Sequence, residues 1–390
     1  MLSDFSELVT LLSGRDLESN DCNSNREGIP YLIGASNIVD GKINITRWTT
    51  KPLVISKRGD ILISCKGTIG EVVTNVIGEI HIARQFMAIQ TSPMVYADYI
   101  ELYIKSIVNN IKRNARGVIP GISREDILHR EIALPPLEEQ KRIVIEVEKW
   151  LDFIADIEAE KDELESHIKK TKSKILDLAI SGKLVPQDPN DEPAIELLKR
   201  INPGFEPCDN SHYENLPENW CLAKVKDVFV INPRNKAEDN TIAGFIPMTL
   251  IDDGYSNTFS YEKRKWGSIK TGFTHFADGD VAVAKISPCL ENRKSIVLRD
   301  LPNGIGAGTT ELHVFRSSVV VPEYALYFFK SEYFISKCVG TFNGVVGQQR
   351  VGKNIIEEIQ IPIPPINEQT KIVSTIETIF TKLNTITAEL

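Results

Sequence analysis

The 390-residue sequence predicts an α+β protein with two domains built on one plan, whose curved β-sheets are linked by two long antiparallel helices that form a coiled coil. Three observations predict this fold. A heptad pattern of apolar residues runs through residues 138–181, short β-rich runs separated by turn residues fill a long block on either side of it, and the start of the heptad helix occurs twice. The predicted limits are domains at 1–137 and 220–362, helices at 138–182 and 363–390, and a linker at 183–219.

The first block reads as a sheet followed by a helix. Its β-rich runs are residues 29–45, 59–76 and 81–90, and Asp40-Gly41 between two apolar stretches is a hairpin signal. In residues 96–117, apolar and aromatic side chains recur one helical turn apart. This pattern predicts a helix that packs on the sheet of the first domain.

The heptad helix follows directly. Pro135 and Pro136 precede it and Gly182 follows it, as is typical of helix start and stop signals. Apolar residues at alternating steps of four and three form its stripe, as they do in coiled-coil spacers of any function. The stripe residues are Ile143, Val147, Trp150, Ile154, Ile157, Leu164 and Ile168.

The rest of the chain repeats this order after a linker. The linker is rich in proline and acidic residues at 185–193 and contains a short predicted helix at 194–201. The run GDVAVAKISPCLEN at 279–292 corresponds to GDILISCKGTIGEV in the first block, and a second helical stretch follows at 321–340. The second block therefore repeats the layout of the first with a diverged sequence.

The helix starts are the best preserved part of the repeat. Residues 132–144 read IALPPLEEQKRIV and residues 361–373 read IPIPPINEQTKIV. The second copy continues with its own apolar stripe, so we expect the two stripes to bury each other. The residues of this second stripe are Ile372, Ile376, Ile379, Leu383 and Ile386.

Composition sets limits on the function. The formal net charge is −8, but the excess acid lies in the helices and linker, and the two large blocks are close to neutral, so the charge alone does not demand a nucleic-acid partner. Apolar runs long enough to span a membrane and a basic-then-apolar leader are both missing, which favours a cytoplasmic protein without membrane contact. The six cysteines are dispersed, so we expect reduced thiols.

The sequence lacks the common catalytic motifs. It contains no phosphate-binding G-x-x-x-x-G-K-[ST], no H-E-x-x-H and no G-x-S-x-G. The run Asn232-Pro233-Arg234-Asn235 resembles only the first half of the Asn-Pro-Pro-aromatic element of adenine methyltransferases. We therefore expect a chain that is not an enzyme and binds no metal or cofactor.

Basic and amide side chains concentrate in the loops between the β-rich runs. Glycines beside them allow close approach to a phosphate, and Arg and Gln have the geometry that reads base edges in the major groove. We therefore expect a DNA-reading surface on each domain, although for any single residue of this set a solvated surface loop is the more common explanation. The candidates are Lys57, Arg58, Lys66, Arg84, Gln85, Arg116 and Arg124 in the first block, and Lys263, Arg264, Lys265, Lys285, Arg293, Lys294, Gln348, Gln349, Arg350 and Lys353 in the second.

Taken in order, these parts resemble the specificity (S) subunit of type I restriction-modification systems. The resemblance covers nearly the whole chain and rests on the two P-P-x-x-E-Q helix starts, LDLAISGKLVPQ at 176–187, AKISPCLENRKS at 284–295 and GVVGQQRV at 344–351. It implies two target recognition domains, each reading half of a split, asymmetric site in double-stranded DNA, and helices that set their separation and bind two methyltransferase (M) subunits. It also implies that S-adenosylmethionine, ATP and Mg belong to the M subunits and to further restriction (R) subunits.

Two departures from the family pattern affect assembly. The first domain lacks an equivalent of LPENWCLAKVKDV at 216–228, and the second heptad run is shorter than the first. Half of the first stripe would then be covered by an M subunit or by a second copy of this chain, or the chain would be a shortened form with weaker assembly. A coiled-coil assembly protein with two protein-binding α+β domains is the alternative function.

Overall fold

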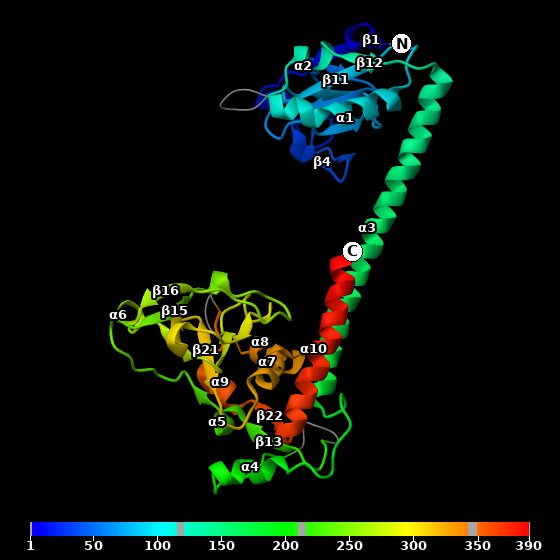
Figure 1. Ribbon diagram of the computed structural model, residues 1–390. Coiled ribbons are helices and arrows are strands. Elements are labelled where there is room, and N and C mark those ends of the chain that lie inside the picture. Colours follow the sequence, from blue (N-terminus) through cyan, green and yellow to red (C-terminus); the bar gives the residue numbers. More distant parts are fainter. Residues whose placement is uncertain (1, 115–120, 210–215, 342–348, 390) are drawn as a thin grey trace. The chain divides into compact units, whose positions relative to one another are not determined.

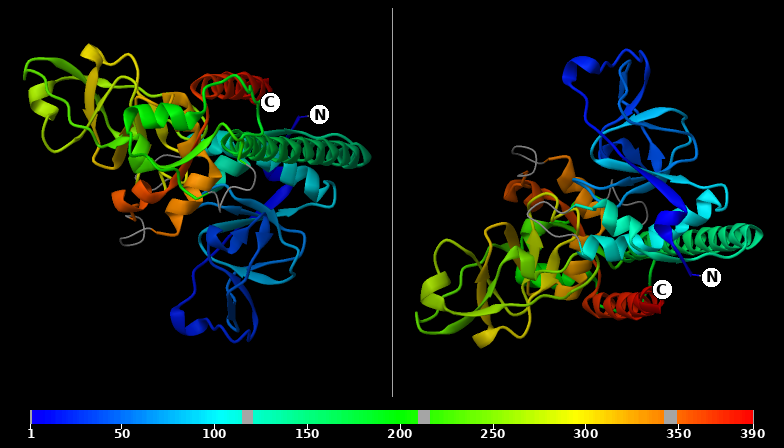
Figure 2. Two further views of the ribbon diagram at one scale, coloured as in Figure 1. Left: turned by 90° about the horizontal axis from the view of Figure 1, so that it is seen from below. Right: turned by 90° about the horizontal axis from the view of Figure 1, so that it is seen from above.

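The computed structural model describes residues 2–114, 121–209, 216–341 and 349–389 (Figure 1). The chain divides into two compact units, Met1–Glu158 and Ala159–Leu390, and the division falls within one 44-residue helix, α3 (Leu137–Ile180). Figure 2 shows the mixture of sheets and helices in each unit from two further directions.

The first unit contains two four-stranded sheets. Their strand orders are β2-β11-β8-β9 and β6-β3-β10-β7, and β1 pairs separately with β12. The contact between β3 and β10 is parallel, and the other pairs of these sheets are antiparallel. The strands are β1 (Leu2–Asp4), β2 (Val9–Ser13), β3 (Ile29–Leu32), β4 (Ile38–Val39), β5 (Lys42–Ile43), β6 (Arg47–Thr49), β7 (Ile55–Ser56), β8 (Ile61–Ser64), β9 (Val72–Thr74), β10 (Ile80–Ile82), β11 (Phe86–Thr91) and β12 (Glu131–Ala133).

Among the described residues, the second unit repeats the two four-stranded sheets and the β1–β12 pair, but not the β4–β5 hairpin. Its sheets have the orders β14-β21-β18-β19 and β16-β15-β20-β17, β13 pairs with β22, and the one parallel contact, between β15 and β20, replaces that of β3 with β10. The prediction of two α+β domains on one plan is therefore confirmed. The strands are β13 (Cys221–Lys224), β14 (Val230–Ile231), β15 (Ile242–Ile246), β16 (Glu262–Lys265), β17 (Thr274–Ala277), β18 (Val281–Ala284), β19 (Ser295–Val297), β20 (Ile305–Gly308), β21 (Leu312–Arg316) and β22 (Gln360–Ile363).

The predicted helices form, with one change. The stretch at 321–340 is two helices, because the buried Ser331 ends the first and caps the second, its Oγ accepting a hydrogen bond from the Phe334 amide at 3.3 Å. The helices besides α3 are α1 (Ala97–Asn114), α2 (Arg124–Leu128), α4 (Ala194–Ile201), α5 (Val225–Val228), α6 (Trp266–Ile269), α7 (Pro322–Lys330), α8 (Glu332–Val339), α9 (Lys353–Glu358) and α10 (Ile366–Glu389).

The hairpin predicted at Asp40-Gly41 joins β4 to β5. Both residues have positive φ, 50° and 68°, as a two-residue turn of type I′ requires. Asp and Gly tolerate this backbone region better than most residues, which is why the dipeptide predicts the turn.

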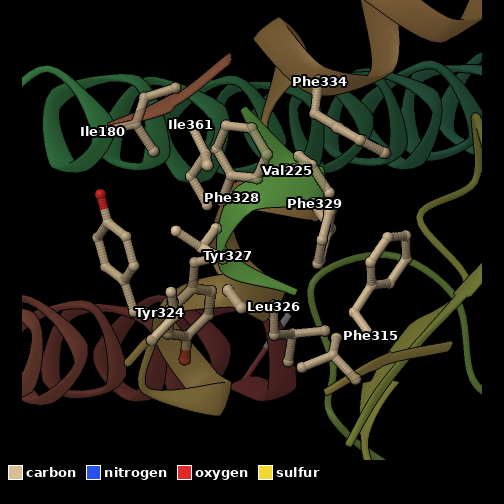
Figure 3. Packing of buried hydrophobic residues seen from close by; sticks show 14 of the residues in the cluster. Ile180, Val225, Phe315, Tyr324, Leu326, Tyr327, Phe328, Phe329, Phe334 and Ile361 are labelled. Atoms are coloured by element: carbon tan, nitrogen blue, oxygen red, sulfur yellow. The ribbon is translucent and has the colours of Figure 1, made fainter. Parts of the chain in front are cut away.

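Each unit has its own hydrophobic core. In the first, α1 packs on the sheet formed by β2, β11, β8 and β9, and residues such as Ile63, Met87 and Ile104 are buried between them. In the second, the aromatic residues of α7 fill the space between the sheet and the helices α3 and α10, and Figure 3 shows Phe328 and Phe329 at the centre of this packing.

The C-terminal part of α3 pairs with α10 inside the second unit. Lys172 Nζ donates a hydrogen bond to Asn384 Oδ1 at 2.6 Å and lies 5.7 Å from the centre of the Phe380 ring. Further along, Ile175 shares a hydrophobic cluster with Ile376. The two helices lie side by side in Figure 1, and these contacts show that they are antiparallel, as the sequence predicted.

Candidate nucleic-acid interface

The end of one sheet gathers candidate side chains in each unit. In the antiparallel sheet of the first unit, the end of β8 lies beside the start of β11, where Phe86 pairs with Ser64. In the second unit the end of β18 lies beside the start of β21, where Leu312 pairs with Ala284. The loops that follow β8 and β18 therefore emerge at corresponding places in the two domains.

In the second unit, backbone hydrogen bonds join three segments of the chain at this sheet end. The Lys285 amide donates to the Glu311 carbonyl at 2.9 Å, and the Val351 amide donates to the Lys285 carbonyl at 2.9 Å. The segment that carries Gln349 and Arg350 is thereby attached to the end of β18. Gln348 lies outside the described residues.

The first unit has the same pattern with other residues. The Cys65 amide donates to the Gln85 carbonyl at 2.7 Å, and the Ile122 amide donates to the Cys65 carbonyl at 3.0 Å. Cys65 thus takes the place of Lys285, and Gln85 takes the place of Glu311. Because Ile122 takes the place of Val351, Arg124, two residues later, takes the place of Lys353.

Arg350 is held in a forked ion pair. Its Nε and Nη2 donate to the two carboxylate oxygens of Glu311 at 2.7 and 2.8 Å. These hydrogen bonds lower the pKa of Glu311, so the carboxylate is charged at neutral pH. The pair fixes the plane of the guanidinium at the sheet end.

The corresponding basic residues of the first unit are less constrained. Lys66 is exposed and its backbone forms a bridge with Gly121. Arg124 Nη1 donates to the Leu11 carbonyl at 2.7 Å and to Ser13 Oγ at 3.1 Å, which holds it at the end of β2. Arg84 is exposed and forms an ion pair with Asp16 at 2.7 Å. Arg116 lies outside the described residues.

Several other sequence candidates lie away from this sheet end. Lys57 and Arg58 are exposed but precede β8, at its opposite end. Lys263 and Lys265 are exposed on the edge strand β16. Arg264, on the same strand, lies 3.7 Å from the centre of the Phe245 ring and pairs with Glu262.

Two further candidates serve the fold of the second domain. Arg293 is only 9% exposed, and its guanidinium donates to the Lys330 carbonyl at 3.0 Å and to Glu332 at 2.8 Å. Lys294 Nζ donates to the Ile251 carbonyl at 2.7 Å. Arg293 is therefore turned into the domain, whereas Lys294 is half-buried with its ammonium bound to the backbone.

Sequence reasoning missed part of the surface around Lys285. An open hollow of about 360 Å³ lies at this sheet end, and Asn232, Arg234, His275 and Thr310 line it together with Lys285. These residues come from segments far apart in the sequence. Among them, only the run Asn232-Pro233-Arg234-Asn235 stood out in the sequence, and it had no assigned function.

The predicted helix stripes are buried over part of their length. Ile168 of α3 and Ile372 and Ile376 of α10 are buried, and Ile379 and Leu383 are half-buried. Phe380, which the heptad count did not include, is 6% exposed and packs edge-on against Tyr327 and Tyr255. Ile386 is 44% exposed.

The N-terminal part of α3 presents its apolar side chains to solvent. Trp150 is 55% exposed, Ile154 and Ile157 are each 49% exposed, and Leu164 is 38% exposed. Near the helix start, Ile143 and Val147 are half-buried. Scattered exposed apolar residues are normal, but a contiguous row of them on one helix is typical of a docking surface.

The described residues contain no group of three or more His, Cys, Asp or Glu that could hold a metal ion. In the same part of the chain, helices are all too short or too polar to cross a membrane.

A family described as type I restriction modification DNA specificity domain matches residues 2–166 and 217–390. The chain is 41% identical over 227 residues to the type I restriction enzyme EcoEI specificity subunit of Escherichia coli, across 53% of this chain and 38% of that relative. The chain thus spans about two fifths of the length of that relative.

Two solved structures share the fold. The HsdS subunit from Thermoanaerobacter tengcongensis superposes with a TM-score of 0.58 at 15% identity, over 100% of this chain and 91% of that one. A chain from a study of complex assembly and conformational transition of the type I R-M system superposes with a TM-score of 0.68 at 15% identity, over 100% of this chain and 92% of that one.

Proposed function

The chain belongs to the family of type I restriction modification DNA specificity domains, and we propose that it is the DNA-recognition subunit of a type I restriction-modification complex. The first domain, within residues 1–137, reads one half of a split site in double-stranded DNA, and the second, within 220–362, reads the other. The chain itself is not catalytic. Methyl transfer from S-adenosylmethionine and restriction driven by ATP and Mg belong to M and R subunits.

One observation carries this proposal. The two domains have the same strand order, and in each of them some of the candidate residues lie at the same end of the same sheet, where the side chains differ. Gln85 corresponds to Glu311, and Gly121 corresponds to Arg350. A shared scaffold with unlike side chains at its reading end is what two readers of unlike half-sites require.

The helices supply the support for protein partners. The exposed apolar residues Trp150, Ile154 and Ile157 form a row on α3, and we propose that M subunits dock there. Light scattering after size exclusion of the isolated chain tests the other occupant, a second copy of the chain. If the isolated chain is a dimer and Ile154→Asp converts it to a monomer, the exposed row of α3 mediates self-association and M-subunit docking there is contradicted.

The function is tested by mapping methylated bases in a genome that carries this chain and its M subunit. The expected result is methylation at one split, asymmetric motif. In parallel, binding of the purified chain to duplex DNA is measured as salt rises, because phosphate contacts release counterions and make affinity fall steeply. Binding that is absent even at low salt would favour the coiled-coil assembly protein with protein-binding domains.

Arg350 offers the sharpest test of separate readers. The change Arg350→Lys keeps the positive charge but removes the planar guanidinium, and with it bidentate recognition of a base edge. We expect a loss of discrimination worth about 1–3 kcal/mol at one base of the second half-site. Lys337→Arg, at an exposed cation of α8, is the matched control. Equal loss at both half-sites would contradict one domain per half-site.

A further inference from the structure

The hollow at the sheet end of the second domain has an unusual charge balance. Two of its lining side chains are cations, Arg234 and Lys285, and none of the described residues that line it is a carboxylate. Thr310 adds a hydroxyl, and Pro233 and Phe273 form apolar walls. Such a surface is complementary to an anion with an apolar body attached.

Two neighbouring cations of this domain, Lys270 and Arg316, are paired with carboxylates, whereas Arg234 and Lys285 are not. Lys270 pairs with Asp239 at 2.7 Å, and Arg316 pairs with Asp280 at 2.7 Å. Within the described residues, neither Arg234 nor Lys285 has a carboxylate oxygen within 4.0 Å. At longer range Glu311 and Arg350, which pair with each other, act on Lys285 with opposite signs, so the positive charge of the hollow is left largely for an external group to balance.

The backbone presents Arg234 to the hollow. Asn232 adopts a left-handed conformation with φ of 56°, and its Oδ1 accepts a hydrogen bond from the Val314 amide at 3.0 Å. On the other side, the Asn235 amide donates to His275 Nδ1 at 3.2 Å. Arg234 thus sits on a short segment anchored at both ends, and its Nη1 lies 3.4 Å from the Phe273 carbonyl oxygen and 3.3 Å from His275 Nε2.

His275 contributes no negative charge to the hollow. Burial lowers its pKa, and the nearby Arg234 lowers it further, so the ring is neutral at pH 7. Because Nδ1 accepts from the Asn235 amide, Nε2 carries the proton and donates to the Lys270 carbonyl at 2.9 Å. Both ring nitrogens are therefore engaged, and the ring acts as a wall rather than as a ligand.

We propose that this hollow binds a backbone phosphate of the DNA strand that runs past the second half-site, with Arg234 and Lys285 as its charged contacts. The proposal rests on the proposed function, because it places the phosphate beside the base-reading Arg350. Phosphate contacts fix position and register without reading sequence. At the corresponding position of the first domain the buried Cys65 stands in place of Lys285, so this cation is not repeated there.

The test uses the full chain and duplex DNA that carries the methylated motif. Fluorescence anisotropy is measured over a range of salt concentrations for the wild type, for Arg234→Gln with Lys285→Met, and for Lys337→Met, which removes one exposed cation of α8, as the control. We expect the double variant to lose affinity equally on target and scrambled DNA, with a salt slope shallower by about 0.9 if the two cations share one phosphate. The control should keep the wild-type slope.

A neutral methylphosphonate placed at one linkage at a time then locates the phosphate. The wild type should lose affinity at one linkage flanking the second half-site, and the double variant should be insensitive at that linkage only. Arg234→Lys with Lys285→Arg should restore the slope, which a merely structural role would not predict. A double variant with wild-type slope and wild-type methylphosphonate sensitivity overturns the site and leaves the function standing. A wild type without salt-dependent DNA binding overturns the function itself.

Discussion

In both proline-led helix starts, the glutamine side chain ties the helix to its own domain. Gln140 Oε1 accepts a hydrogen bond from the Tyr96 amide at 2.8 Å, just before α1. Gln369 Oε1 accepts one from the Val321 amide at 2.7 Å, just before α7. Both glutamines are buried. The repeated Gln is therefore explained by the fold of each domain.

The glutamate beside it behaves differently in the two copies. Glu368 is 2% exposed and accepts a hydrogen bond from Trp220 Nε1 at 3.0 Å. Glu139 is half-buried and pairs with Arg142 on its own helix. The apolar stripes differ in the same way, since Ile372 is 1% exposed whereas Ile143, its counterpart in the repeat, is half-buried. Nearly the same sequence thus gives a covered helix in one copy and an open one in the other.

This difference separates two roles within one motif. What is the same in both copies, the Gln hydrogen bonds, belongs to the domain itself. What differs, the burial of the Glu and of the stripe, depends on the segment that covers the helix, and in the second unit that segment includes Trp220 and the C-terminal part of α3.

The largest expected change in stability comes from a substitution in the apolar stripe of α10. Ile376→Ala removes a fully buried side chain, so we expect it to lower the free energy of unfolding of the second unit by about 2–5 kcal/mol. Ile154→Ala, the same change at an exposed position, should cost less than about 0.5 kcal/mol. Hydrogen exchange followed by mass spectrometry on the full chain measures both, since it reports each unit separately. Similar losses at the two sites would break the comparison.

The next largest change in stability is expected for substitutions of the two buried glutamines, and here the two copies should agree. Gln140→Ala leaves the Tyr96 amide without its acceptor, and Gln369→Ala does the same to the Val321 amide. An unsatisfied buried group costs about 1–3 kcal/mol, so each change should destabilise its own unit by that amount. Hydrogen exchange of α1 and α7 is the readout. A large loss of stability in one unit alone would mean that the buried glutamine stabilises only one of the two domains.

Sequence reasoning predicted the plan of the molecule better than its reading surface. Strand runs, helix starts and the repeat are local patterns, and they predicted both domains and the pairing of α3 with α10. Phe380 was missed because a strict heptad count selected Ile379, whereas a straight helix of 3.6 residues per turn buries Ile372, Ile376 and Phe380 in steps of four.

The surface could not be predicted because it is assembled from separate segments. Arg293 carried the right chemistry, but its backbone φ of 59° and its contact with Glu332 turn it into the domain. Arg234 looked like a fragment of an unrelated motif, and only the folded chain brings it into the same hollow as Lys285.

The buried glutamate gives the smallest effect and has a definite sign. Burial raises the pKa of Glu368 above its ordinary value, so the folded state favours the protonated form more than the unfolded state does. Its contribution to stability is therefore fully present in acid, below the unfolded pKa, and is lost as pH rises through the folded pKa. Glu368→Gln, which is neutral at every pH, should stabilise the second unit at pH 7 and confer little gain at pH 4.

Hydrogen exchange of α10 at the two pH values, corrected for the intrinsic rate, measures this gain. Glu139→Gln is the matched control at the open helix start, where the side chain is solvated and paired with Arg142, and it should show no such pH-dependent gain. If both changes gave the same pH dependence, burial by the covering segment would not be the cause. If neither did, the Trp220 hydrogen bond would compensate fully for the desolvation of the Glu368 carboxylate.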